Sequence, residues 1–267
     1  MIMKTKFYSF ALLAFVATFM AFAPAQAQFR IGSDGLEFDL EDNNKTIQVS
    51  TIVEIDNNGF DIGFPIITTI PSFEIGWNII SNPNYDLYEG TGVGKFFNTH
   101  NWKTTQVTVN LLQVAAINDS RTLGIGVGVG IRSNDYRFEH NQSIERTTGI
   151  VMPYEVGPSA KGCEPKKSKF NVASVHIPVE VFFGNPTRFA FSIGGYVDMV
   201  MNSHTKIKYY GGQKEKAYNF PTNFIQAGAV ARFTIYGVSL FASYQPTSIF
   251  KSSRGPELQQ WTIGLAL

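Results

Sequence analysis

The feature that most constrains this 267-residue chain is a two-residue alternation of apolar with small or polar side chains, which recurs in eight segments after residue 70. Alternation at this period is typical of β-strands, because successive side chains point to opposite faces of a sheet. We therefore predict an all-β fold with eight strands. The segments are 71–80, 102–117, 123–140, 170–183, 188–210, 224–237, 238–246 and 259–267.

The connections between these segments alternate in length. Consecutive strands joined in this way run antiparallel, and every long connection falls at the same end of the sheet. Short turns at one end and long loops at the other are typical of up-and-down transmembrane β-barrels, with the turns periplasmic and the loops external. The short connections are 118–121, 184–187 and 236–237, and the long ones are 81–100, 141–168, 207–219 and 246–257.

The stretch "LGIGVGVGIRS" at 123–133 has glycine at every second position up to Arg132. A soluble strand usually turns polar side chains toward water, whereas here one face is aliphatic and the other is bare. In a membrane barrel the aliphatic face meets lipid and the glycines face a narrow lumen, where they leave room for longer neighbours. In a soluble barrel the apolar face would fill the core instead, but the alternating loop lengths favour the membrane barrel.

Five charged residues occupy the polar face of the predicted strands. Three acids and two bases at such positions predict a mutually paired cluster in the lumen, because a buried charge is tolerated only when it is paired. The alternative is that some of them lie near strand ends in water. The five are Glu74, Arg132, Glu180, Asp198 and Arg232.

The first 70 residues differ from the rest. Residues 1–27 hold Lys4 and Lys6 and an apolar run, and the sequence "APAQAQ" follows at 23–28. Together they predict a signal peptide over 1–27, cleaved after Ala27, rather than a membrane anchor. Residues 28–70 carry eight acids and two bases with several turn signals. We expect an acidic, β-rich or partly ordered periplasmic segment there, with a ninth and tenth strand as the alternative, and the barrel over 71–267.

The predicted external loops are rich in basic residues. Such side chains suit the phosphates of lipopolysaccharide or acidic glycans, although they can equally be ordinary solvated loop residues. The net charge of +1 argues against nucleic acid as a partner. The candidates are Lys166, Lys167, Lys206, Lys208, Lys214, Lys216, Lys251 and Arg254.

Aromatic residues gather near the predicted strand ends. Barrels of outer membranes carry girdles of aromatic side chains at both membrane interfaces, and we expect the same here. The residues are Trp102, Tyr136, Phe138, Tyr209 and Phe250 on the external side, and Phe183, Phe189, Tyr236 and Trp261 on the periplasmic side.

Catalysis has weak support in the sequence. Ser174 and His176 share a strand face with Glu180 beyond them. Side chains two apart on a strand lie about 7 Å from each other, too far for a direct hydrogen bond. The histidines His100, His140 and His204 show no metal-ligand spacing, and the repeating glycines are not a nucleotide-binding loop. We therefore predict no catalytic residue, metal or cofactor.

Several stretches resemble the outer-membrane β-barrel domain family of Gram-negative bacteria, in its PorT-like group. They are "SFEIGWN", "LGIGVGVGIRSNDYRF", "HIPVEVFFGN", "SHTKIKYYGGQKEK" and "FKSSRGPELQQWTIGLAL". The architecture is similar to small eight-stranded barrels such as OmpX and the OmpA transmembrane domain. The resemblance implies an outer-membrane location and insertion by the barrel-assembly machinery. Trp261, Ile263 and Leu265 keep an alternating pattern that resembles the barrel-assembly signal of such proteins. The chain ends in Leu267, however, where many such barrels end in Phe.

Together these features predict an outer-membrane barrel with a packed polar lumen, acting as a structural or surface-interaction protein through its basic loops. One alternative is a narrow porin-like channel for ions or small solutes. Another, which the resemblance permits, is an accessory component of a protein secretion system.

Overall fold

The structure is a computed structural model, and it describes residues 27–32, 35–40, 45–51, 53–56, 59–62, 70–118, 122–139, 141–185 and 188–267. The predicted signal peptide lies outside the described residues except for Ala27. His140 and parts of the short turns at 118–121 and 184–187 also lie outside them.

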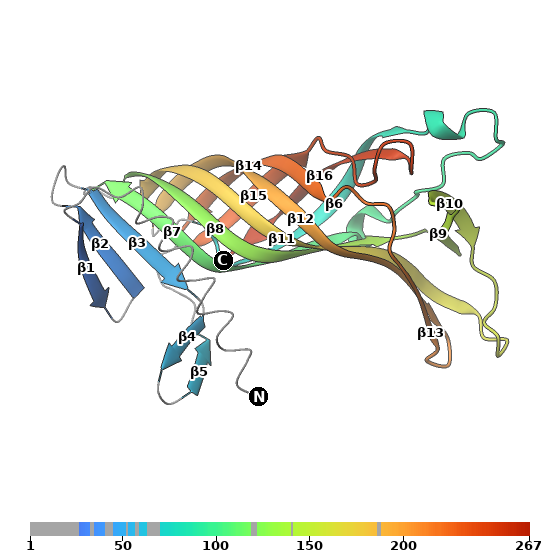
Figure 1. The fold of residues 1–267 in the computed structure, drawn as a ribbon, viewed down its shortest axis with the longest axis horizontal. Coiled ribbons are helices and arrows are strands. Elements are labelled where there is room, and N and C mark those ends of the chain that lie inside the picture. Colours follow the sequence, from blue (N-terminus) through green and yellow to red (C-terminus); the bar gives the residue numbers. More distant parts are fainter. Residues whose placement is uncertain are drawn as a thin grey trace.

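Eight strands form a closed antiparallel β-barrel (Figure 1). β6 is hydrogen-bonded to both β7 and β16, which closes the sheet on itself. The predicted all-β fold with eight antiparallel strands is confirmed. In order around the barrel the strands are β6 (Phe73–Asn84), β7 (Thr105–Asn118), β8 (Leu123–Arg137), β11 (Pro165–Asn185), β12 (Phe189–Tyr209), β14 (Ile225–Ile235), β15 (Val238–Gln245) and β16 (Glu257–Ala266).

Short and long connections fall at opposite ends of the barrel, as predicted. We call these the turn end and the loop end. The turn end carries the links from β7 to β8, β11 to β12 and β14 to β15. The long links at the loop end carry further elements, namely η1 (Asp86–Tyr88), η2 (Asn101–Lys103), the hairpin of β9 (Gln142–Thr147) and β10 (Ile150–Glu155), and β13 (Lys214–Tyr218).

The predicted loop 141–168 is shorter than expected, because β11 begins at Pro165 instead of residue 170, whereas β12 ends at Tyr209, next to the predicted strand end at 210. Both strands have 21 residues, and β13 pairs with the outer end of β12. Residues 165–171, residues 204–209 and β13 together form an arm. Figure 1 shows this arm curving away from the barrel axis at the loop end. The prediction missed the start of β11 because lysines replace the apolar half of the alternation there, and the predicted loop 207–219 contains β13, which was not expected.

The barrel wall is apolar outside and polar inside. The side chain of Ile131 is 47% exposed on the outer face, whereas its neighbour Arg132 is 2% exposed in the lumen. Exposed aliphatic or aromatic side chains occur on the outer face of all eight strands, from Ile75 on β6 to Leu265 on β16. This arrangement is the reverse of a soluble barrel, in which the apolar face fills the core. No helix in the described part of the chain is long and apolar enough to cross a membrane.

The glycines of β8 face the lumen and make room for other parts of the chain. A Cβ added to Gly130 would lie 2.4 Å from the carbonyl oxygen of Val109 and 2.7 Å from Oδ1 of Asn110. A Cβ on Gly128 would lie 3.1 Å from Cγ of Pro178 and 3.5 Å from Cδ1 of Ile70. The bare face of β8 therefore lets neighbouring side chains pack into the lumen.

Three strands of the acidic segment continue the sheet beyond the barrel. They are β1 (Ala27–Gly32), β2 (Gly35–Leu40) and β3 (Lys45–Thr51). β3 pairs with residues 112–118 of β7, whereas β6 pairs with residues 105–109 of the same strand. β4 (Val53–Asp56) and β5 (Gly59–Ile62) form a separate hairpin. The predicted β-rich segment thus contains strands that join the sheet at the turn end.

Candidate functional site

The five charged residues predicted for the lumen form one connected chain. Nε of Arg232 lies 2.9 Å from both carboxylate oxygens of Glu180, and its Nη2 lies 2.6 Å from Oε1 of Glu74. Arg132 lies between Oε2 of Glu74, at 3.7 Å, and Oδ2 of Asp198, at 3.0 Å. Acids and arginines alternate along the chain, so each arginine lies between two carboxylates.

Strand register places these side chains at successive levels of the lumen, since on β12 Asp198 lies four residues from Gly194, the partner of Glu180. Arg132 lies directly opposite Thr108, and its Nε donates to Oγ1 of Thr108 at 3.0 Å. Glu180 lies opposite glycine on both neighbouring strands, at Gly126 and Gly194. A Cβ on Gly194 would lie 2.8 Å from Cγ of Glu180, so the missing side chain leaves space for the carboxylate. The charged groups are thus positioned by their neighbours across the sheet.

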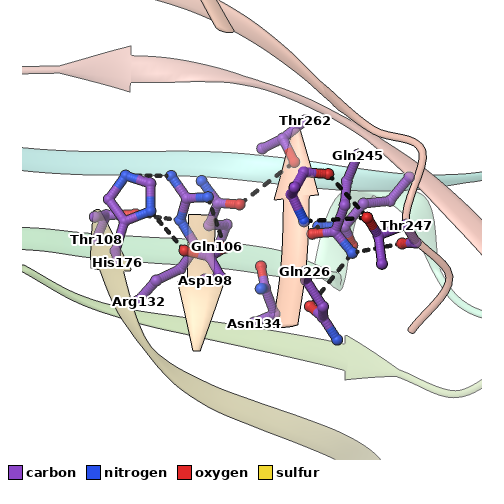
Figure 2. A network of polar contacts seen from close by, with 12 residues as sticks. Gln106, Thr108, Arg132, Asn134, His176, Asp198, Gln226, Gln245, Thr247 and Thr262 are labelled. Atoms are coloured by element: carbon purple, nitrogen blue, oxygen red, sulfur yellow. Dashed lines mark hydrogen bonds and ion pairs between the residues drawn. The ribbon is translucent and has the colours of Figure 1, made fainter. Parts of the chain in front are cut away.

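His176 joins the chain of charges, which the sequence analysis missed. It lies opposite Asp198, with Nδ1 at 2.6 Å from Oδ1, and its Nε2 lies 2.9 Å from Nη2 of Arg132 (Figure 2). A guanidinium only donates hydrogen bonds, so Nε2 accepts, and Nδ1 carries the proton donated to Asp198. The imidazole is therefore neutral. In a Ser-His-Asp triad, Nε2 of the histidine takes the proton of the serine, but here Nε2 of His176 is hydrogen-bonded to Arg132.

A layer of amide side chains lies above the charges toward the loop end. Asn78 donates to Oδ1 of Asn134 at 2.9 Å and accepts from Oγ1 of Thr262 at 2.7 Å. Gln245 donates to Gln226 at 3.3 Å and accepts from Gln260 at 3.4 Å. Figure 2 shows the two groups side by side, with His176, Arg132 and Asp198 in one and Gln226 and Gln245 in the other. Toward the loop end, hydrogen bonds between uncharged side chains therefore take the place of the ion pairs.

Aromatic side chains close the loop end of the lumen. Phe170 packs against Phe250 and Phe220 with ring centroids 5.5 and 5.2 Å away, and Phe97 lies 5.8 Å from Phe250. All four long links contribute to this layer. The prediction that Tyr136, Phe138, Tyr209 and Phe250 form an outer girdle was wrong, because these four residues are buried, each no more than 4% exposed. Of that predicted set only Trp102 is exposed, at 83%.

The aromatic side chains predicted for the other end face outward. Phe183, Phe189 and Tyr236 are exposed beside the turn end. Trp261 is also exposed, but it lies in the middle of β16 and stacks on Tyr244 with ring centroids 4.6 Å apart.

The chain itself enters the lumen at the turn end. Ile70, Pro71 and Ser72 are buried, directly before the start of β6. Nδ2 of Asn110 donates to the carbonyl oxygen of Pro71 at 2.7 Å, and the amide of Ile70 donates to Oε1 of Gln113 at 3.3 Å. These contacts fix the entering segment to β7, so it covers the charged layer from below.

Six of the eight predicted basic candidates gather on the arm. They lie in strands or at a strand end rather than in irregular loops, which corrects their predicted setting. Lys208 on β12 pairs with Lys167 on one side and Lys214 on the other, and Lys206 pairs with Lys169 and Lys216. The six are Lys166, Lys167, Lys206, Lys208, Lys214 and Lys216.

The charges of the arm act on one another. Lys167 and Lys206 lower the pKa of Lys208. Partial loss of hydration and the charges of Lys216 and Lys169 lower the pKa of Lys206. Within the described residues, Lys169 is the one lysine with an acid in ion-pair distance, namely Asp135.

The other two basic candidates lie in the link between β15 and β16. The amide of Arg254 donates to the carbonyl oxygen of Lys251 at 3.1 Å, and the amide of Val151 donates to the carbonyl oxygen of Arg254 at 2.8 Å. Lys251 and Arg254 therefore help to hold the long links together and lie apart from the lysines of the arm.

Neither a scan against models of protein families nor a search of curated proteins found a match for this chain. Within the described residues, no three His, Cys, Asp or Glu side chains come together in a way that could hold a metal ion. The two distinctive sites are therefore the filled lumen and the lysine face of the arm.

Proposed function

We propose that this chain is an outer-membrane β-barrel protein with a closed lumen, which acts as a structural or surface-interaction protein through its loop end. The observation that carries the proposal is the inverted barrel wall, apolar outside and charged inside. The turn end would then be periplasmic and the loop end external, as in outer-membrane barrels.

The outer wall supports a lipid surrounding. Soluble monomers rarely expose contiguous apolar patches beyond a few hundred Å². Here the outward positions of β14 read Ile225, Ala227, Ala229, Ala231, Phe233 and Ile235 without a polar residue. In lipid only helices and closed barrels satisfy every backbone hydrogen bond, and the strand pairing here closes the ring.

The filled lumen supports an interaction role over a channel role. The charged layer, the amide layer and the aromatic layer succeed one another along the axis, and residues 70–72 enter from the turn end. An eight-stranded barrel has an interior only wide enough for side chains. With the interior occupied by these side chains and by residues 70–72, the external elements remain as the working surface.

Conductance of the folded chain in planar bilayers tests the closed lumen. Heat-dependent mobility on gels first shows that the barrel has folded, and we expect no steady single-channel steps from that material. Arg254→Ala, outside the lumen, serves as the control for Arg132→Ala and Arg232→Ala. Steady steps in the unaltered chain, changed by the two lumen variants and unchanged by the control, would establish the narrow channel instead.

Cell fractionation tests the location. We expect the chain in the outer-membrane fraction, with the lysines of the arm open to an amine-reactive reagent that does not cross the membrane. A chain recovered in the soluble periplasmic fraction would contradict the proposal. A secretion defect on deletion, with the barrel silent in bilayers, would favour the accessory role in secretion.

A further inference from the structure

The arm carries two rows of cations on one face. Cross-strand pairing places Lys167, Lys208 and Lys214 side by side in the outer row. The inner row runs across four strands, from Arg137 on β8 through Lys169 and Lys206 to Lys216 on β13. Directly opposite side chains on a sheet lie about 5 Å apart, and the next pair on the same face lies about 7 Å further along. The rows therefore form a compact grid of positive charge.

This grid is unfavourable in isolation. Like charges placed directly opposite each other destabilise a sheet. Asp135 neutralises Lys169 only, and Glu215 points to the other face of β13, where it accepts a hydrogen bond from the hydroxyl of Tyr209. The repulsion between these lysines is relieved when an anion with several charges binds across the grid.

The grid lies on the face that continues the apolar outer wall. On β11 the outward positions run from Phe183 and Val179 through Asn171 to Lys169 and Lys167. On β12 a register shift after the Ser174–Val200 pair inserts Met201, so that His204, Lys206 and Lys208 remain on the outward face. On the opposite face of the arm, its own Ile207 and Tyr209 are buried in a small apolar cluster with Val156.

The curvature of the arm decides where the grid points. Bulged strands bend at the extra residue. Figure 1 shows the arm leaning away from the barrel axis beyond this point. Because the arm leans away from the barrel axis, its outer face tilts back toward the plane around the barrel. If the barrel wall spans a membrane, that plane is the membrane surface.

The tip of the arm adds a pocket of about 280 Å³. Lys166, Lys167, Lys208 and Lys214 line it together with the turn after β12. Nζ of Lys166 lies 5.5 Å from the centre of the Tyr210 ring, which holds one cation beside the opening. The pocket offers a compact anionic group several donors at once.

We infer that the outward face of the arm binds the phosphate groups of a phosphorylated glycolipid in the surrounding leaflet, with Lys167, Lys206, Lys208, Lys214 and Lys216 as ligands. Two rows of cations fit a headgroup with more than one phosphate, and the apolar wall below them fits its acyl chains. This inference rests on the membrane location proposed above.

The test uses the full chain in phosphatidylcholine nanodiscs that contain either bis-phosphorylated lipid A or the same lipid without phosphates. Native mass spectrometry counts the lipid A bound as its fraction in the disc rises. The variant changes the outer row, as Lys167→Gln with Lys208→Gln and Lys214→Gln. A control of equal charge change uses exposed lysines of links away from the arm, as Lys95→Gln with Lys103→Gln and Lys251→Gln.

We expect the outer-row variant to weaken binding of phosphorylated lipid A by at least about tenfold, because each lysine near a charged lipid surface contributes separately. The control should stay within about twofold of the unaltered chain, because its lysines lie away from the grid. Equal binding by the outer-row variant, or equal binding of the lipid without phosphates, would overturn the inference. Equal competition by inorganic phosphate in solution would overturn the assignment to a lipid.

Two measurements on the same samples separate this inference from the proposed function. Vesicle flotation and heat-dependent gel mobility report whether the chain enters a bilayer as a folded barrel. A chain that does not enter overturns the proposed function and the inference together. A chain that enters but does not distinguish the two lipids overturns the inference alone.

Discussion

In the lumen, Arg132 and Arg232 lie between carboxylates, whereas on the arm Lys206 and Lys208 lie among other lysines. Both groups belong to the same curved sheet, and β11 and β12 contribute to each. The lumen arginines are 2% exposed and have bonded partners from four strands. The arm lysines are in contact with solvent and repel one another.

The difference teaches what each group can do. Charges whose bonds are already made inside the protein stabilise a particular arrangement of strands and leave few donors for a ligand. Charges that face like charges raise the free energy of the unbound state, and a ligand of opposite sign removes that cost. The lumen therefore holds the barrel together, while the arm is the region suited to binding.

Removal of Glu74 should have the largest effect on stability and tests the contrast between lumen and arm most directly. Its carboxylate contacts both arginines, so Glu74→Ala leaves two buried cations with fewer partners. We expect a loss of about 3–5 kcal/mol in the free energy of unfolding. Urea titration in detergent, read by gel mobility, measures it. Lys208→Ala on the arm should cost nothing or stabilise, and similar losses for both variants would refute the contrast.

Close packing beside the charges provides the next largest effect. Gly130→Ala places a Cβ 2.4 Å from the carbonyl oxygen of Val109, which belongs to the backbone and has little freedom to move. We expect a loss of about 1–3 kcal/mol by the same titration. Gly157→Ala is the matched control, because nothing lies within 4 Å of its added Cβ. An unchanged midpoint for Gly130→Ala would mean that the lumen is looser than its contacts indicate.

The long links offer a smaller, pH-dependent effect. The hydroxyl of Tyr88 donates to the carbonyl oxygen of Val151 at 2.5 Å, and burial raises the pKa of Tyr88 from 10.0 to about 12. A folded-state pKa above the unfolded value means that this contribution is complete below the unfolded pKa and lost as the pH rises through about 12. Ultraviolet titration should show the late phenolate step.

Tyr88→Phe is the corresponding variant. It should lower the amplitude of the late step by one phenolate, because the pKa of Tyr209 is also raised to about 12 and that residue still contributes. It should also cost about 1 kcal/mol at neutral pH, because one hydrogen bond between the links is lost. An unchanged amplitude in Tyr88→Phe would show that Tyr88 does not ionise in that step.

The smallest expected effect is proton uptake when the arm binds phosphorylated lipid. Partial loss of hydration and neighbouring lysines lower the pKa of Lys206, neighbouring lysines lower that of Lys208, and a bound phosphate should raise both again. Binding above about pH 9 should then take up a fraction of a proton, measured by calorimetry in buffers with different heats of ionisation. The charged and titratable groups around this pair are Lys167, Lys169, Lys214, Lys216, Arg137, Asp135 and His204.

A conservative double variant separates charge from titration. Lys206→Arg with Lys208→Arg keeps both cations charged at every pH used, because arginine does not release its proton in this range. Binding should persist without proton uptake. Uptake that persists in this variant would assign the titration to other groups.

Most of the barrel could be predicted because its pattern is local. Alternation over residues such as 123–131 fixes a strand without knowledge of its partners, and the lengths of the links fix the direction of the strands. The strand end at Tyr209 was predicted closely, but the rest of the arm was missed, because Lys167 and Lys169 replace apolar residues at the start of β11. Backbone pairing with β12 continues β11 there and adds β13, and the sequence does not display that pairing.

The site was predictable in part for the same reason. The five lumen charges stand out because charged residues are rare on the alternating face. Their order of contact depends on register between strands, so His176 was compared with Ser174 and Glu180 on its own strand instead of Asp198 on the next. The aromatic layer was misplaced because an aromatic residue near a strand end has the same spacing whether it faces inward or outward.

The bond between Glu74 and Arg232 joins residues 158 positions apart, one on β6 and the other on β14. Until the first and last strands meet, an open sheet in a bilayer would expose these charges to hydrocarbon, where an unpaired ion is very unfavourable. For the outer-membrane barrel proposed above, insertion and closure would then occur as one event. The interior charges would act there as a checkpoint in assembly, since a barrel missing a strand would gain no stable place in the membrane.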